Sequence, residues 1–358
     1  MKIVVYAICK NESKFIKRWY DSMKEADSIY VLDTGSTDDS VKILKSLGVN
    51  VKTHKFKSFR FDEARNMALS MTPDDALCVC TDLDEVFLPG WRKLLEENYD
   101  GETRIGYTYN WSLTNNKPNI SFILDNIHTK KDYKWTHPVH EVLTNINQNE
   151  TRKNILDITL NHFPDVKKSR SSYLPLLELS VKEDPEDDRN MHYLGREYMY
   201  YKKYNEAIDT LIKHLKLKSA TWKDERCASM RFIARCYKEL KRYDESILWY
   251  QKAITEAPHL RDPYIELALL YYELENYDEI IKYVKMALNI KSHQKTYINE
   301  VFAWNETPYD ILSLALYYKG LLPESIYYLD LGININPENE RLINNRKIIL
   351  EILNKGLQ

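Results

Sequence analysis

The stretch Cys78-Val-Cys-Thr-Asp82-Leu-Asp84-Glu85-Val-Phe87 decides the fold prediction, because a short apolar run ends there in three carboxylates. The run from Ala76 to Thr81 is too short for a helix and is typical of a buried parallel strand. Ligands of open α/β sheets collect at the carboxyl ends of such strands. The three acidic residues therefore occupy a place typical of a binding site.

Asp82 and Asp84 are one residue apart, so an extended backbone points both side chains the same way. Two converging carboxylates suit a hard cation that carries a diphosphate, and Mg²⁺ and Mn²⁺ both accept oxygen ligands. The sequence therefore predicts a divalent metal, Mn²⁺ or Mg²⁺, at this position. An acidic turn after a strand also occurs as a helix cap or a solvated loop, and that interpretation stays open.

Composition and charge exclude some classes of protein. The 358 residues predict two or three domains, and 44% hydrophobic with 29% charged residues is ordinary for a water-soluble chain. A net charge of −2 argues against a nucleic-acid partner. We expect no membrane span, and the apolar start at residues 1–9 has no cleavage site, so we predict a strand there and a cytoplasmic location. The five cysteines include no Cys-x-x-Cys pair, which favours reduced core thiols.

Strand-like and helix-like segments alternate in the first part of the chain. The expected strands cover residues 3–9, 28–33, 49–54, 76–81, 104–111 and 120–124, and the expected helices cover 13–25, 39–47, 61–71 and 91–98. Alternation of this kind implies βαβ crossovers. We therefore predict an α/β N-terminal domain with a Rossmann-like, mostly parallel sheet.

Two further strand ends carry candidate binding residues. Asp33 ends the second strand, where its carboxylate can accept a hydrogen bond from a nucleotide base or ribose, and Gly35 permits close backbone approach. Ser36 lies in the same turn, although this segment serves equally well as the cap of the next helix. Asn11 and Glu12 end the first strand and can line the same site, or form an ordinary polar turn.

Arg65 lies on the expected helix 61–71, and its guanidinium can clamp a phosphate or a base edge. A helical arginine exposed to solvent is the alternative. With Arg65 the candidates come from several separate segments, each of which is a weak signal when taken alone.

Taken together, four segments in this order resemble family 2 glycosyltransferases of the GT-A fold: Ile8-Cys-Lys-Asn-Glu12, Val31-Leu-Asp-Thr-Gly-Ser-Thr-Asp38, Glu63-Ala-Arg-Asn66 and Thr81-Asp-Leu-Asp-Glu85. The resemblance covers roughly the first 165 positions. It implies that Asp33 binds the nucleobase, and that Asp82 and Asp84 hold the diphosphate of a nucleotide sugar through a divalent metal. It also implies inversion at the anomeric carbon, and it places Glu85 with the donor-binding residues.

A second candidate segment is Tyr133-Lys-Trp-Thr-His137-Pro-Val-His140-Glu141-Val-Leu143. It resembles a valine-histidine-glutamate element late in the same catalytic domain. By this resemblance His140 is a third metal ligand, and Glu141 is the candidate general base that deprotonates the acceptor. A histidine satisfied within a turn is the alternative. Relatives carry an arginine shortly before this element, whereas the present chain has Lys130 and Lys131, so the cation that contacts the diphosphate stays open.

The second half of the chain is repetitive. A short motif recurs at intervals of about 40 residues, as Tyr204-Asn-Glu-Ala207, Tyr243-Asp-Glu-Ser246, Tyr277-Asp-Glu-Ile280 and Leu322-Pro-Glu-Ser325. Small residues such as Gly195 precede the turns. The pattern resembles tetratricopeptide repeats, in which small residues let paired helices approach each other. We therefore predict an all-α repeat domain.

The predicted boundaries are residues 1–165 for the GT-A domain, 166–187 for a bridging helix and linker, and 188–358 for the repeats. An insertion near residues 293–304 precedes the fourth repeat. The repeats offer either a concave surface for the acceptor or a partner, or a rigid scaffold and homodimer interface.

The pairing of the two domains also resembles the peptide glycosyltransferases that modify cysteine or serine in bacteriocins (glycocins). This resemblance implies a UDP-sugar donor and a peptide acceptor, with a surface glycan or lipid-linked sugar as the alternative acceptor. Two other classes compete with this interpretation. A sugar-1-phosphate nucleotidylyltransferase needs a Gly-rich loop after the first strand, where this chain has Lys10-Asn-Glu12, and a non-catalytic peptide-binding scaffold needs the repeats alone.

Overall fold

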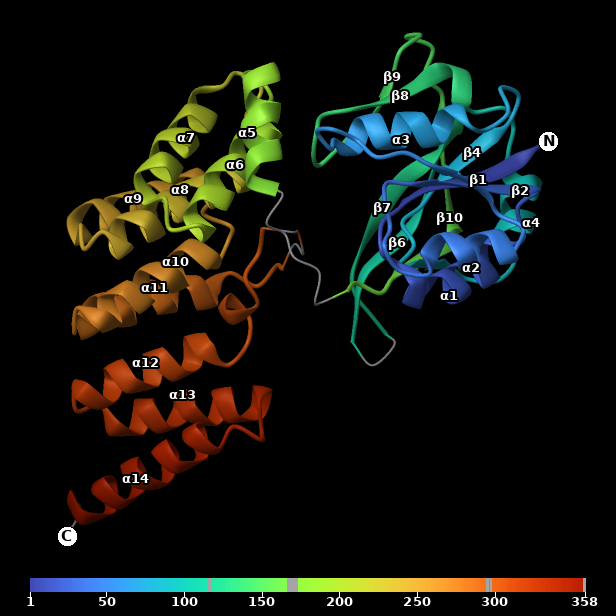
Figure 1. The fold of residues 1–358 in the computed structure, drawn as a ribbon. Coiled ribbons are helices and arrows are strands. Elements are labelled where there is room, and N and C mark those ends of the chain that lie inside the picture. The colour runs from blue at the N-terminus through green and yellow to red at the C-terminus, as the bar shows by residue number, and fades with distance from the viewer. Residues whose placement is uncertain (115–116, 166–172, 294–295, 297, 357–358) are drawn as a thin grey trace. The chain divides into compact units, whose positions relative to one another are not determined.

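The N-terminal unit, Met1–Ser180, is built around a mixed sheet with the strand order β3-β2-β1-β4-β7-β6-β10-β5 (Figure 1). The computed structural model describes residues 1–114, 117–165, 173–293, 296 and 298–356. The strands of the main sheet are β1 (Ile3–Cys9), β2 (Ser28–Asp33), β3 (Asn50–Thr53), β4 (Leu77–Cys80), β5 (Glu85–Phe87), β6 (Arg104–Thr114), β7 (Lys117–Thr129) and β10 (Arg152–His162). Strands β8 (Tyr133–Thr136) and β9 (Val142–Asn145) form a separate antiparallel pair.

Helices cover both faces of this sheet because the central strand is apolar on both sides. In β1, Ile3, Val5 and Ala7 share a core with helix α1, whereas Val4 and Tyr6 share another with helix α3. Figure 1 shows α1 and α2 on one face and α3 on the other. The helices of this part of the chain are α1 (Ser13–Met23), α2 (Ser40–Ser46), α3 (Phe61–Ser70) and α4 (Trp91–Asn98), with the 3₁₀ turn η1 (Lys130–Asp132).

The direction of the strands determines where the candidate residues lie. Strands β3, β2, β1 and β4 are mutually parallel, so the segments that follow β1, β2 and β4 leave the sheet at the same edge. Strand β7 runs antiparallel to β4 and β6, and β10 runs parallel to β6. The predicted α/β class with a mostly parallel, GT-A-like sheet and a helical repeat region is confirmed.

One predicted strand is much longer than the sequence indicated. The expected segment 120–124 is the middle of β7, which continues to Thr129 and pairs with β4 through Ile127 and His128. The polar residues Asp125 and Asn126 interrupt the apolar pattern there. These turn-forming residues therefore prevented the prediction of the C-terminal part of β7. Its pairing with β4 in the folded unit, not its local sequence, makes it a strand.

The C-terminal unit, Val181–Gln358, consists of paired helices. They are α6 (Asp188–Tyr200), α7 (Tyr204–Lys216), α8 (Lys223–Glu239), α9 (Tyr243–Glu256), α10 (Asp262–Glu273), α11 (Tyr277–Asn289), α12 (Thr307–Tyr318), α13 (Leu322–Ile335) and α14 (Glu340–Gly356), with the 3₁₀ turn η2 (Val301–Ala303). Each of the four recurring motifs opens the second helix of a pair: Tyr204, Tyr243, Tyr277 and Leu322 are the first residues of α7, α9, α11 and α13.

The division between the units falls after Ser180, within the predicted linker 166–187. Helix α5 (Tyr173–Glu183) corresponds to the predicted bridging helix, and residues 166–172 lie outside the described residues. Of the predicted insertion, residues 294, 295 and 297 also lie outside them, as do the last two residues of the repeat domain. All five cysteines are described, and they are buried free thiols as predicted. In the described part of the chain, every helix is too short or too polar to cross a bilayer.

Candidate active site

The turns after β1 and β2 are tied to each other by hydrogen bonds. The backbone N–H of Asn11 donates to Oγ of Ser36 at 2.8 Å, and the backbone N–H of Thr37 donates to Oδ1 of Asn11 at 2.7 Å. The backbone N–H of Glu12 donates to Oγ of Ser40 at 2.9 Å. The structure thus brings Asn11, Glu12 and Ser36 together at the edge where the parallel strands end.

Asp33 is 1% exposed and shapes the second of these turns. Its carboxylate accepts hydrogen bonds from the backbone N–H groups of Gly35 at 3.2 Å and Ser36 at 3.1 Å. Gly35 has φ +108°, a conformation that side chains rarely adopt. Binding of a nucleobase by Asp33 stays a prediction. In this structure its carboxylate holds the turn that would face the nucleotide.

Arg65 joins the third strand end to the segment after β8. Its Nη2 lies 3.0 Å from Oδ1 of Asp82, and its Nε lies 2.5 Å from Oε1 of Glu141. The side chains of Arg65 and Glu141 are each 11% exposed. Burial lowers the pKa of the guanidinium, but the charges of Asp82 and Glu141 outweigh it and raise that pKa above its ordinary value. Arg65 therefore stays charged between two carboxylates.

Glu85 is buried beneath the acidic pair. Its Oε2 accepts a 2.9 Å hydrogen bond from the backbone N–H of Asp82, and 6% of the residue is exposed. Burial first, and then the negative charge of Asp82, raises the pKa of Glu85 to about 8. A carboxyl group with this pKa is mostly protonated near pH 7, so the negative charge at this strand end is that of Asp82 and Asp84.

His162 is the site residue that sequence reasoning missed. It is the last residue of β10, and its Nε2 lies 3.6 Å from Oδ2 of Asp84. Its Nδ1 lies 3.0 Å from the carbonyl oxygen of Trp111. Burial lowers the pKa of His162, but the contacts with Asp84 and Trp111 raise it more, so the pKa lies above its ordinary value. No strand was predicted at residues 152–162, although the apolar and β-branched residues at 155–160 are a signal that could have drawn attention to this strand and to the residue that ends it.

His140 directly precedes Glu141, the partner of Arg65. Its backbone has φ 51°, and its ring centroid is 5.8 Å from that of Tyr173. Ligation of a metal by His140 stays a prediction. Within the described residues, one group of three potential ligands has its atoms within 4.8 Å of one another, and that group is in the helical unit rather than at Asp82 and Asp84.

The acidic strand end nevertheless has the chemistry of a divalent cation site. Asp82 and Asp84 offer carboxylate oxygens, and the neighbouring imidazole of His162 offers a nitrogen. The side chain of Asp82 is 47% exposed, and those of Asp84 and His162 are 19% and 18% exposed. The donor types of these residues suit Mn²⁺ or Mg²⁺, and the contact between Asp84 and His162 brings two of them together.

An open α/β sheet with acidic and polar residues at its carboxyl edge defines the class of domains that bind a phosphorylated ligand there. Residues 4–159 match the family model Glycosyl transferase family 2, and residues 232–260 match the model Tetratricopeptide repeat. The first unit thus carries a family 2 glycosyltransferase domain, and the second carries a tetratricopeptide repeat. The first match supports glycosyl transfer as the general activity.

Solved structures similar to this chain include repeat proteins. MamA is 20% identical and has a TM-score of 0.39, with 50% of this chain and 99% of that chain covered. YrrB, described as a TPR protein with an unusual peptide-binding site, is 14% identical with a TM-score of 0.40 and coverage of 50% and 84%. A thermophilic TPR protein from Thermus thermophilus is 16% identical with a TM-score of 0.35 and coverage of 50% and 90%.

Proposed function

We propose that this protein is a metal-dependent, inverting glycosyltransferase that moves a sugar from a UDP-sugar to a peptide acceptor. The observation that carries the proposal is the contact of His162 with Asp84, close in the chain to Asp82 and Glu85, at a strand end within the residues matched by the family 2 model. The carboxylates of Asp82 and Asp84 can bind a divalent cation, and a cation there can hold a diphosphate.

The turns after β1 and β2 would bind the nucleoside part of the donor. Asn11, Glu12, Asp33, Gly35 and Ser36 come from these turns, and the hydrogen bonds between them fix the backbone before any ligand arrives. A preformed turn loses little conformational entropy on binding. The preference for uridine rests on the resemblance of these segments to the family.

Asp82, Asp84 and His162 would hold the metal. His140, the third ligand predicted from sequence, is the alternative to His162. A divalent cation at this place neutralises the charge that develops on the leaving diphosphate. Arg65 would position Asp82, because its guanidinium fixes Oδ1 of that carboxylate at 3.0 Å. Glu85 would hold the same segment through the backbone N–H of Asp82.

Inversion requires one displacement at the anomeric carbon. The acceptor oxygen or sulfur forms a bond to that carbon while the bond to the β-phosphate oxygen breaks, and the acceptor proton passes to a base. Glu141 is the base predicted from sequence. Its contact with Arg65 counts against this role, because a carboxylate paired with a guanidinium is a weaker proton acceptor. We therefore assign Glu141 first to positioning Arg65.

The acceptor side of the proposal rests on the repeats. Paired helices of this type form extended surfaces suited to peptides, and we propose a cysteine or serine side chain as the acceptor. The alternative is a glycan or lipid-linked acceptor, and the acceptor experiment below distinguishes the two. A cytoplasmic location and a homodimer formed through the repeats remain part of the proposal.

The decisive experiment measures UDP release by the purified chain from a panel of UDP-sugars, with and without Mn²⁺. We expect slow Mn²⁺-dependent hydrolysis and a rise in melting temperature with the preferred donor, because a ligand that binds only the native state stabilises it. Asp84→Asn should abolish both effects, whereas Asp157→Asn, an exposed change in β10, should leave them intact. Absence of binding and turnover with every donor and metal would refute the proposal.

The acceptor is tested separately with peptides that contain cysteine or serine, using mass spectrometry to detect an added hexose. Modification of peptides supports the proposed acceptor. Transfer only to glycans or lipid-linked sugars would replace the peptide acceptor and leave the glycosyltransferase proposal standing.

A further inference from the structure

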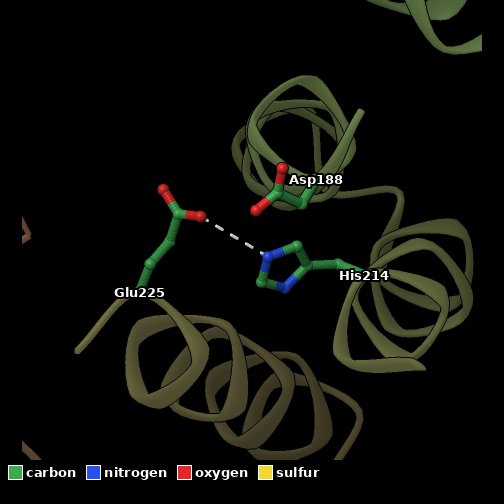
Figure 2. Close-up of side chains that lie close together, drawn as sticks. All are labelled: Asp188, His214 and Glu225. Carbon is green, nitrogen blue, oxygen red and sulfur yellow. Dashed lines mark ion pairs between the residues drawn. The ribbon is translucent and has the colours of Figure 1, made fainter. Parts of the chain in front are cut away.

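A second cluster of metal-ligand side chains lies in the helical unit, where the glycosyltransferase proposal assigns nothing. Asp188 is the first residue of α6, His214 lies in the last turn of α7, and Glu225 lies in the first turn of α8. One ligand atom from each lies within 4.8 Å of the other two. Figure 2 shows the three side chains directed toward one another from separate helices.

The imidazole of His214 provides the strongest indication of a ligand at this point. His214 is fully buried, and its Nε2 is a buried atom without a hydrogen-bond partner among the described residues. Oε1 of Glu225 lies 3.5 Å from this nitrogen (Figure 2). A buried polar atom of this kind costs about 1 to 3 kcal/mol when it is left unsatisfied. Nε2 therefore faces two carboxylates without bonding directly to either.

The other ring nitrogen of His214 is held by a serine. Nδ1 of His214 lies 2.9 Å from Oγ of Ser229, and the same Oγ lies 2.7 Å from Nδ1 of His192. When His214 donates from Nδ1 and Ser229 donates onward to His192, Nε2 of His214 presents a lone pair. Histidines that bind metals are held in this way, since a second group accepts the hydrogen from the other nitrogen.

Neighbouring groups favour a cation at the same point. Glu225 is 6% exposed, and a carboxylate at this depth can be a ligand of a bound cation. Both acidic residues also lie in first turns of helices, where a carboxylate stabilises the helix dipole. That structural role alone does not explain why a buried imidazole nitrogen without a hydrogen-bond partner faces two carboxylates.

The geometry points to a zinc-binding site formed by Asp188, His214 and Glu225. Zn²⁺ takes nitrogen and carboxylate oxygen at about 2.1 Å in a tetrahedron, so two of its ligand atoms are about 3.4 Å apart. The 3.5 Å between Nε2 of His214 and Oε1 of Glu225 matches that edge. Asp188 is only partly buried, so the cation has an approach from solvent and a fourth position is left for water.

The test uses the full chain carrying Asp82→Asn and Asp84→Asn, which removes the candidate ligands in the first unit. The protein is stripped with a chelator and titrated with ZnCl₂ by calorimetry, and CoCl₂ serves as a visible-absorption probe of tetrahedral coordination. We expect one equivalent of zinc, an intense tetrahedral cobalt spectrum that zinc abolishes, and a higher melting temperature of the zinc-bound protein.

Glu225→Gln and His214→Gln should each weaken zinc binding at least about a hundredfold, because even the loss of an outer partner of a ligand costs 10- to 100-fold. Asp188→Asn, a change at a partly buried helix start, tests the site should His214→Gln fail to fold. Asp224→Asn is the matched control, because Asp224 precedes Glu225 in the same turn and pairs with His259 at 2.8 Å. It should bind zinc as tightly as the parent, which is the full chain carrying only Asp82→Asn and Asp84→Asn.

Two results would overturn the site. Failure of the parent chain to bind zinc would leave the cluster as an ion pair between His214 and Glu225. Equal zinc affinity in the parent and in folded Glu225→Gln and Asp188→Asn would place the bound zinc elsewhere. Because these measurements use no sugar donor, they are independent of the glycosyltransferase proposal.

Discussion

Nε2 of His162 lies 3.6 Å from Oδ2 of Asp84, although the two residues belong to distant parts of the chain. The pairing of β10 with β5 produces this relationship. His162 is the register partner of Glu85, and the backbone N–H of Phe163 donates to the carbonyl oxygen of Asp84 at 2.9 Å. Strand β10 thereby places the imidazole of His162 beside Asp84, in the acidic segment that follows β4.

Replacing His162 by glutamine should reduce metal-dependent UDP release about a hundredfold or more, because it removes a nitrogen ligand while Asp82 and Asp84 remain. The measurement is the Mn²⁺ dependence of UDP release. Asp157→Asn, on the same strand but exposed, should match the unmodified chain. Unchanged Mn²⁺ dependence in His162→Gln, together with its loss in His140→Gln, would return the third ligand to His140.

Replacing Arg65 by glutamine should lower the free energy of unfolding by about 3 kcal/mol, since it leaves the carboxylate of Glu141 buried without its cation. The estimate is at the low end for a buried pair because the side chain of Asp82 is 47% exposed. Urea unfolding measures the effect. Arg152→Gln, at a pair whose arginine is 54% exposed, should cost less than about 1 kcal/mol.

A double-mutant cycle separates the Arg65 and Glu141 pair from other effects of the substitutions. With Glu141→Gln as the second change, the coupling should lie between about 0.5 and 3 kcal/mol. Additive effects would show that Arg65 stabilises the unit through packing, for instance through its position over the Trp135 ring, 5.1 Å from the centroid.

Local sequence signals were enough to predict the first four strands, the helices α1 to α4 and the edge where the candidate residues lie, but they did not predict β5, β8, β9 and β10. Helix α1 begins at Ser13 as expected, with Trp19 and Met23 buried on one face. The contact of His162 with Asp84 could not be predicted, because it depends on β10 pairing with β5 in a particular register. The ion pair between Arg65 and Glu141 was not predicted either. From the sequence, Arg65 was assigned to the donor and Glu141 to the acceptor, and a contact between the two residues was not considered.

Gly195→Ala should destabilise the helical unit by about 1 to 3 kcal/mol through overpacking. A Cβ at this position would lie 2.4 Å from Cγ of Leu211, so α6 and α7 could not keep their present spacing. Thermal unfolding followed by circular dichroism measures the loss. Leu211→Ala removes the clashing side chain but also loses buried contacts, so Gly195→Ala and Leu211→Ala together should cost less than the sum of the two single changes, and additive costs would contradict this packing explanation.

A buried hydrogen-bond chain in the first unit should make its stability depend on pH. Nε1 of Trp135 donates to the hydroxyl of Tyr6 at 2.7 Å, and that hydroxyl lies 2.8 Å from Nε2 of His128. Nδ1 of His128 lies 3.0 Å from the carbonyl oxygen of Thr129. With Nδ1 donating and Nε2 accepting, every link is satisfied by a neutral imidazole. A second proton on His128 would displace the hydrogen that Tyr6 donates.

Burial first of all lowers the pKa of His128 from 6.5 to about 4. The unfolded chain therefore binds this proton more readily, and its contribution to stability is complete above pH 6.5 and is lost as pH falls toward 4. The loss should reach about 3 kcal/mol, since each pKa unit corresponds to about 1.4 kcal/mol. Urea unfolding from pH 7 to pH 4 measures it, and subtracting the values for His128→Gln removes the contributions of other groups. A difference between the two proteins that stays constant across this range would show that His128 is protonated equally in the folded and unfolded chains.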